Sequence, residues 1–183
     1  GRPVHSLHSY FLRPGDVAKP IEFEVDILRD GRSFSARRVQ ASQEGKAIFS
    51  MIASFQDPSG GMSHSDAMPE NLPEPEDLAA AATILANFDH PITNYWAKAR
   101  PFDLRHTDQP IYLSAAKEQS AKQCVWFKPI TKLPADDGVE MASLAYASDY
   151  SILESIMRRH GLSWAHKGLS SASLDHAMWF HQK

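Results

Sequence analysis

The sequence contains a single cysteine, Cys124, and no apolar run that approaches the length of a membrane-spanning helix. One cysteine cannot form an intramolecular disulfide, which favours a reducing compartment, and we expect Cys124 to be a small buried residue. A spanning helix needs roughly 18 consecutive apolar residues, and the first residues lack the apolar core of a signal peptide. These absences predict a soluble, cytoplasmic protein without a membrane partner.

An excess of charge of either sign is also missing. Lys and Arg together number 19, Asp and Glu 22, and the formal net charge is −3. A chain with this balance lacks the excess of basic residues that is typical of nucleic-acid-binding proteins. No glycine-rich phosphate loop is present, and the histidines lie at no metal-ligand spacing. We therefore expect no nucleic-acid partner, no metal and no cofactor. Hydrophobic residues make up 43% of the chain, which is typical of a globular protein.

The first part of the chain has the pattern of a β-meander. Between residues 21 and 27, Ile and other apolar residues alternate with three carboxylates, a period of two that predicts a half-buried strand. Turn signals at Asp30-Gly31 and Glu44-Gly45 bound two further runs of strand length, 33–42 and 46–56. With residues 4–12, four strands are expected. Their shared apolar face has no helix within the first 57 residues to cover it.

Residues 58–98 are expected to form a linker with one short helix. The stretch to about Pro75 is rich in Pro, Gly, Ser and Asp and has no periodicity. Residues 77–88 are alanine-rich and begin with an acidic residue, as helices often do.

The last part of the chain predicts two strands, a long helix and a final strand. The strands cover 101–105 and 123–131, and the helix covers 139–160 with Gly161 as its C-terminal stop. The final strand covers residues 170–181. In this last strand Asp175 and His176 point to opposite faces, so they cannot hold one metal ion together.

Asp149 is the first candidate for chemistry. It lies on a helical stripe with Ala145, Ile152, Leu153 and Ile156. A carboxylate on an apolar face is costly unless hydrogen-bonded, and such surroundings suit it to acid and base catalysis. The alternative is that Ser148 and Asp149 form a cap where the helix breaks and restarts.

Ser173 is the second candidate. It lies in the predicted last strand, 170–181, on a face that opens with hydroxyl groups. No G-x-S-x-G motif is present, so Ser173 is better suited to orienting a water molecule than to nucleophilic attack. The alternative is a solvated serine at a strand edge. Arg37 and Arg38 could meet a phosphate, although ion pairs with Asp or Glu across the sheet are the more common outcome.

Five runs in this order resemble the acyl-CoA thioesterase II family. They are VHSLHSYFLRPGD at 4–16, RDGRSFSARRVQASQEGKAIF at 29–49, ASFQ at 53–56, YASD at 146–149 and SLDHAMWFH at 173–181. The resemblance implies an α+β double-hotdog fold, in which each antiparallel sheet wraps a long helix. It also implies hydrolysis of acyl-CoA to a free fatty acid and CoA without a metal.

The family's catalytic residues are an Asp, a Thr or Ser, and a Gln. By motif, the resemblance places the Asp at Asp149 and the hydroxyl at Ser173, and it puts the Gln on strands outside this chain. It implies that 1–57 is the sheet portion of a first hotdog lacking its helix. Residues 99–183 would then be the first part of a second hotdog lacking its last strands. A homo-oligomer is expected, and the alternative function is an inactive hotdog fragment that binds acyl chains or serves as an assembly surface.

Overall fold

The computed structural model describes residues 1–89 and 91–181, which belong to two compact units. Unit 1 comprises Gly1–Ser63 and Ser171–Lys183, and unit 2 comprises His64–Ser170. Residues 182–183, at the end of the segment 99–183 assigned to a second hotdog, lie outside the described residues. No helix within the described part of the chain is long and apolar enough to cross a membrane.

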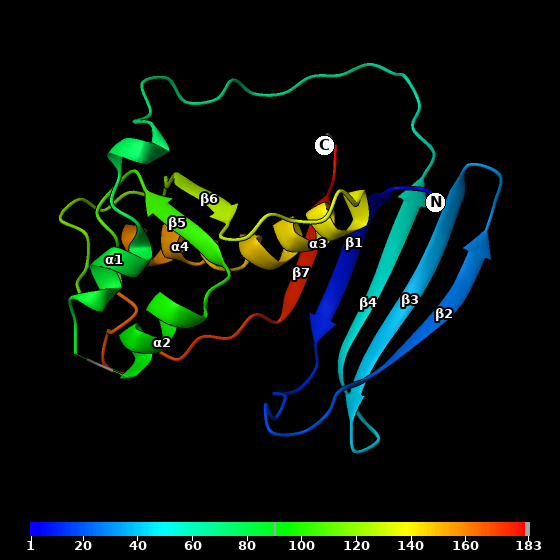
Figure 1. The fold of residues 1–183 in the computed structure, drawn as a ribbon, viewed down its shortest axis with the longest axis horizontal. Helices are drawn as coiled ribbons and strands as arrows, with labels where there is room; N and C mark the ends of the chain where they lie inside the picture. The colour runs from blue at the N-terminus through cyan, green and yellow to red at the C-terminus, as the bar shows by residue number, and fades with distance from the viewer. Residues whose placement is uncertain (90, 182–183) are drawn as a thin grey trace. The chain divides into compact units, whose positions relative to one another are not determined.

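Unit 1 is built on one five-stranded antiparallel sheet (Figure 1). Its order is β2-β3-β4-β1-β7. The strands are β1 (Val4–Phe11), β2 (Glu22–Asp30), β3 (Phe34–Gln43), β4 (Lys46–Gln56) and β7 (Asp175–Trp179). All four strands predicted for the first part of the chain are confirmed.

The predicted strand order is wrong at one position. In a simple meander β1 would neighbour β2, but β1 pairs with β4, with Phe11 opposite Phe49. The loops explain the difference. Glu44 and Gly45 both have positive φ, 51° and 73°, and form the two-residue turn that joins β3 and β4. The link from β1 to β2, residues 12–21, is longer, so it can reach past β4 and β3 to the far side of the sheet.

The sheet has the two unlike faces that the alternation predicted. On one face, Phe23, Val25 and Ile27 remain 67%, 60% and 69% exposed. On the other face, the Arg38 guanidinium lies 2.7 Å from the Asp26 carboxylate. Arg37 lies opposite Ile27 on the first face and pairs with Asp30 at 2.6 Å, so both arginines take part in ion pairs. The apolar side chains of β2 are thus left uncovered in this chain.

The last strand is shorter than the predicted 170–181 and joins the sheet through β1. His176 lies opposite Ser9, and the Ser9 hydroxyl donates to the His176 carbonyl over 3.2 Å. The Phe11 N–H extends this pairing by donating to the Leu174 carbonyl over 3.0 Å. A strand near the end of the chain therefore completes the sheet formed by its beginning.

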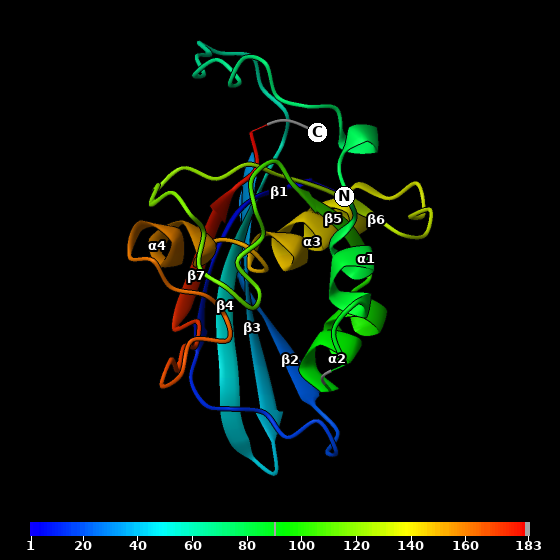
Figure 2. The same ribbon diagram turned by 90° about the vertical axis from the view of Figure 1, so that its left-hand side faces the viewer.

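Unit 2 contains a two-stranded antiparallel sheet and four α-helices (Figure 2). The elements are a 3-10 turn (Pro75–Asp77), α1 (Ala81–Ala86), α2 (Pro91–Ala99), β5 (Phe102–His106), β6 (Val125–Pro129), α3 (Asp137–Ser148) and α4 (Glu154–Arg159). The strand predicted at 101–105 is present one residue later, and the strand predicted at 123–131 and the alanine-rich helix are present in shorter form. Helix α2 falls in the predicted linker and was missed. The buried cluster of unit 2 combines α1, β5 and α3 through Leu85, Leu104 and Ala147.

The long helix predicted for 139–160 is wrong, because the segment forms two helices with a turn between them. Asp136 caps α3, where its carboxylate accepts from the Gly138 N–H over 2.8 Å. The Ser148 hydroxyl donates to the Ala145 carbonyl over 2.9 Å, a local bond that competes with helix continuation. Helix α3 ends there with Asp149 as its C-cap. The helix thus breaks at Ser148 and Asp149, as the cap alternative supposed, and restarts after Leu153.

The predicted helix stop at Gly161 is confirmed. Its φ is +66°, a conformation that favours glycine. The Leu162 N–H donates to the Met157 carbonyl over 2.8 Å, and the Gly161 N–H donates to the Arg158 carbonyl over 3.2 Å. These two bonds make a Schellman motif, which satisfies the last carbonyls of α4.

Candidate functional site

Asp149 lies at the C-terminal end of α3 and is exposed in this chain. The expectation of a buried carboxylate is wrong here, because the stripe chosen from the sequence is the outer one. Ile152 and Ile156 are 61% and 58% exposed. The buried residues of this region are instead Met141, Ala147, Glu154, Met157 and Arg158. The Asp149 side chain is accessible to a molecule from solution.

Ser173 lies in unit 1, in the extended segment that leads into β7, and it is also exposed. The carbonyl of the next residue, Leu174, accepts a hydrogen bond from the Phe11 N–H of β1, which fixes the backbone here. Asp149 belongs to unit 2, so each candidate is held by the framework of its own unit. Cys124, expected to be buried, is half-buried, and its carbonyl accepts from the Thr107 N–H over 3.1 Å.

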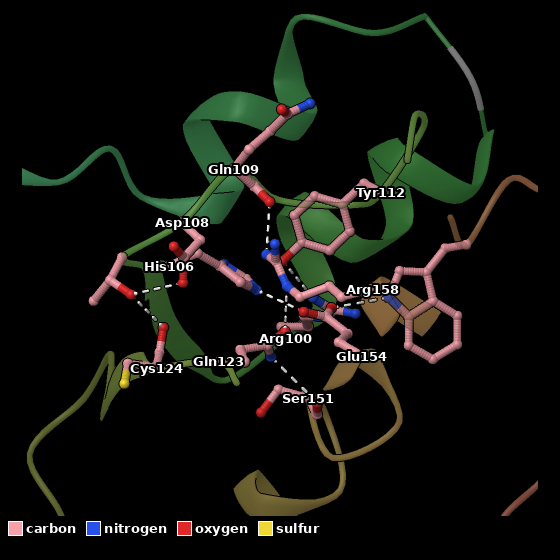
Figure 3. Close-up of polar contacts among 12 residues, drawn as sticks. Arg100, His106, Asp108, Gln109, Tyr112, Gln123, Cys124, Ser151, Glu154 and Arg158 are labelled. Atoms are coloured by element: carbon pink, nitrogen blue, oxygen red, sulfur yellow. Dashed lines mark hydrogen bonds and ion pairs between the residues drawn. The ribbon is translucent and has the colours of Figure 1, made fainter. Parts of the chain in front are cut away.

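A buried polar cluster in unit 2 was not predicted (Figure 3). His106 Nε2 lies 3.0 Å from Glu154 Oε2, and both side chains are 1% exposed. Trp164 Nε1 donates to the other carboxylate oxygen over 2.9 Å. Arg158 Nε donates to Gln123 Oε1 over 2.7 Å, and its Nη2 donates to the Gln109 carbonyl over 2.6 Å. The cluster joins β5 to α4 and to the two loops beside them.

The charge of Glu154 is stabilised from several directions. Desolvation by burial raises the pKa of Glu154, but the hydrogen bond and charge of His106 act against it. The hydrogen bond from Trp164 and the nearby charge of Arg158 also lower this pKa. The net effect is a pKa below the ordinary value of 4.5. Glu154 is therefore a carboxylate in the folded protein.

A second group of side chains surrounds the Arg100 guanidinium. Its Cζ lies 5.0 Å from the ring centre of Trp96, 5.7 Å from Tyr112 and 4.8 Å from Tyr150. Arg100 Nη1 also donates to the Tyr112 hydroxyl over 3.4 Å. Burial raises the pKa of Tyr112 to about 12 despite the neighbouring Arg100 charge. Burial likewise raises the pKa of Tyr150, so both phenols are neutral at physiological pH.

The buried cluster holds unit 2 together and is closed to a substrate, because the side chains of His106 and Glu154 are almost fully buried. Sequence reasoning missed it for a physical reason. Glu154 and Arg158 are four residues apart, the spacing of an ordinary solvent-exposed ion pair on a helix. Leu153 and Met157 form an apolar pair at the same spacing, but one such pair is not enough to identify the buried face of the helix. Among residues 1–89 and 91–181, no group of three His, Cys, Asp or Glu side chains could hold a metal ion.

We expect acid to weaken the folded state through Glu154. Because its folded pKa lies below 4.5, the contribution of Glu154 to stability is present above that pH and is lost as pH falls through the folded pKa. The free energy of unfolding by urea, compared at about pH 7 and about pH 4, should fall less in Glu154→Gln than in the unchanged protein. An equal fall in both would show that other carboxylates carry the acid sensitivity.

Two family models match separate parts of the chain. The acyl-CoA thioesterase N-terminal domain matches residues 1–56, and the acyl-CoA thioesterase model matches residues 102–183. The first covers the strands β1 to β4, and the second covers β5 through β7, including Asp149 and Ser173. Both candidate residues thus fall within the second match.

Three known proteins show how far the similarity extends. Acyl-CoA thioesterase 2 of Haemophilus influenzae is 35% identical over 99% of this chain and 64% of its own length. The crystal structure of an acyl-CoA thioesterase II from Mycobacterium marinum is 41% identical, with a TM-score of 0.74 over 99% of this chain and 63% of that one. A hot dog fold protein from Alicyclobacillus acidocaldarius, 17% identical with a TM-score of 0.68, covers 100% of this chain and 60% of its own and shares the fold. The chain spans less than two thirds of each of these proteins.

Proposed function

Because this chain belongs to the acyl-CoA thioesterase II family, we propose that the full-length protein hydrolyses acyl-CoA thioesters to a free fatty acid and CoA. The observation that carries the proposal is the match of acyl-CoA thioesterase models to both 1–56 and 102–183. Relatives named as acyl-CoA thioesterases are similar over nearly the whole chain. Acyl-CoA is therefore the proposed substrate, and CoA enters as part of it and not as a cofactor.

In this proposal Asp149 polarises the attacking water, and Ser173 positions it. A carboxylate can accept the proton that water loses as it attacks the thioester carbonyl, and a hydroxyl can orient the water by a hydrogen bond. Both side chains are exposed, as contact with a substrate requires. Backbone N–H donors near the start of a helix would stabilise the oxyanion that develops on the carbonyl. A Gln from outside this chain completes the proposed set.

The proposed architecture is a double hotdog to which this chain contributes 1–57 and 99–183, joined by 58–98. Two features of unit 1 support it. Phe23, Val25 and Ile27 form an uncovered apolar face of the kind that a packed helix would bury. The other feature is β7, which stands at the edge of the sheet and can pair with a further strand. The same edge and face favour the proposed homo-oligomer, and the cytoplasm is its proposed compartment.

Ser173→Ala in the full-length protein should lower kcat about tenfold, the effect of losing one hydrogen bond to the reacting water. The KM for a medium-chain acyl-CoA should change little, because Ser173 is assigned to the water and not to the substrate. Thiol release measured with a chromogenic disulfide reports both constants. Ser171→Ala, two residues earlier and also exposed, is the matched control.

Ser173→Thr separates the hydroxyl from the side chain that carries it. It keeps the hydroxyl and should retain most of the activity. Equal activity of Ser173→Ala and the unchanged protein would remove Ser173 from the mechanism, whereas a loss in Ser171→Ala of the same size would show that the segment matters only structurally.

A further inference from the structure

Unit 2 contains a cleft of about 390 Å³ that the proposed reaction does not use. It is bounded by the start of α1, the end of α2, and the strands β5 and β6 with the residue that follows. Figure 2 shows α1 and α2 beside each other in this unit. The volume falls within the range of about 300–1,000 Å³ that is typical of small-molecule sites. Neither Asp149 nor Ser173 is among its lining residues.

The walls of the cleft are largely apolar. Its lining includes alanines at the start of α1 and the side chains of Trp96, Phe102, Leu104 and Ile130. Phe102 and Leu104 are buried and belong to the core of unit 2, so this side of the cleft is rigid. Ile130 remains 62% exposed. Such walls gain free energy by burying an aliphatic chain.

The charges that line the cleft are mostly positive. Lys98, Arg100 and Lys128 contribute three cations, and among the described residues none of them takes part in an ion pair. The one lining carboxylate, Asp103, is held by Arg105 at 3.0 Å and is thereby neutralised. The cleft therefore offers net positive charge beside an apolar wall.

Arg100 adds a donor held in a fixed orientation. Three aromatic rings surround its guanidinium, and its Nε is buried with no hydrogen-bond partner among the described residues. The guanidinium therefore places a fixed positive charge beside the cleft, which attracts an anion, while its Nε is too buried to contact one. Both lysines are exposed and can move to meet such a group.

We propose that this cleft binds an amphipathic monoanion, a medium-chain fatty carboxylate, with its chain on Trp96, Phe102 and Ile130 and its head group at Lys98, Arg100 and Lys128. A carboxylate with an aliphatic chain needs only apolar walls and cations. A nucleotide base would also need hydrogen-bonding side chains on the walls, where Asp103 is already engaged. The site is separate from the residues proposed for hydrolysis.

Calorimetric titration of the full-length protein with decanoate tests the proposal. Decanoate should bind, and decanol, which has the same chain without the charge, should bind at least tenfold more weakly. The double variant Lys98→Gln/Lys128→Gln should weaken decanoate binding at least tenfold. Lys122→Gln/Lys132→Gln removes the same charge outside the cleft and should leave binding unchanged. Ala82→Trp, which fills the opening from an exposed position, should abolish binding.

Decanoate binding that is unaffected by Lys98→Gln/Lys128→Gln and by Ala82→Trp would overturn the proposal, because the ligand would then lie elsewhere. Binding of CoA in place of decanoate, with the same dependence on the two lysines, would also overturn it in favour of a phosphate ligand. Asp149→Asn should bind decanoate as the unchanged protein does. The proposal can therefore fail while hydrolysis stands, and hydrolysis can fail while decanoate still binds.

Discussion

Asp149→Asn in the full-length protein should lower kcat for acyl-CoA hydrolysis by about 10²–10⁴-fold, the usual contribution of a positioned acid or base. An amide has nearly the shape of the carboxylate but cannot accept the proton of the attacking water. KM should stay within a few-fold, because the acyl chain and CoA keep their contacts. Thiol release under saturating acyl-CoA measures the loss.

The change at Asp149 has little reason to affect folding. The residue is exposed at the end of α3, and surface substitutions usually alter stability by less than about 0.5 kcal/mol. Asp108→Asn is the matched control, since Asp108 is also an exposed aspartate of unit 2. It should leave kcat unchanged. Full activity in Asp149→Asn, with unaltered circular dichroism, would exclude Asp149 as the catalytic base.

Glu154→Leu should lower the free energy of unfolding by about 3–5 kcal/mol, because it leaves two buried hydrogen-bonding partners without an acceptor. The Glu154 carboxylate accepts from Trp164 at 2.9 Å and lies 3.0 Å from His106 Nε2. Leucine supplies no acceptor for either group, and both are held in the core of unit 2. Urea denaturation followed by tryptophan fluorescence gives the change directly.

Two further variants show whether the pair, and not the helix, carries this effect. Glu140→Leu removes an exposed glutamate from the first turn of α3 and should cost less than about 1 kcal/mol. The double variant His106→Leu/Glu154→Leu should lose less than the sum of its two single variants, because neither partner is then left alone. Additive losses would contradict a direct coupling between His106 and Glu154.

Local patterns predicted the strands of unit 1 well. The alternation around Phe23 and the glycine turn at Glu44-Gly45 are short-range signals, and each has a direct steric or burial cause. The strand order was not predictable in the same way. The pairing of β1 with β4, and of β7 with β1, joins residues far apart in the chain. No short turn connects these strands, so no local sequence signal predicts that they pair.

The helical region shows a different limit. Apolar residues at Ile152 and Ile156 suggested the buried face, yet the buried side chains include Glu154 and Arg158. Charged residues become buried only when partners from other elements are present, here His106 and Gln123. Those partners come from β5 and the loop before β6, so helical periodicity could not reveal them.

The candidate residues for chemistry were reached by motif. The helical stripe predicts a buried carboxylate at Asp149, but the structure shows this side chain exposed at a helix end. Its proposed role therefore rests on the YASD run and the family, and not on burial. Ser173 has the same basis in the SLDH run, and periodicity contributed only its place at the start of a strand face.

Release of CoA from a medium-chain and a long-chain acyl-CoA by the purified full-length protein tests the central claim most directly. Free thiol and free fatty acid should appear in equal amounts, faster than without protein, and the rate should collapse in Asp149→Asn but not in Asp108→Asn. Tight binding of acyl-CoA with no release of CoA would contradict thioester hydrolysis and would identify a protein that only binds acyl chains.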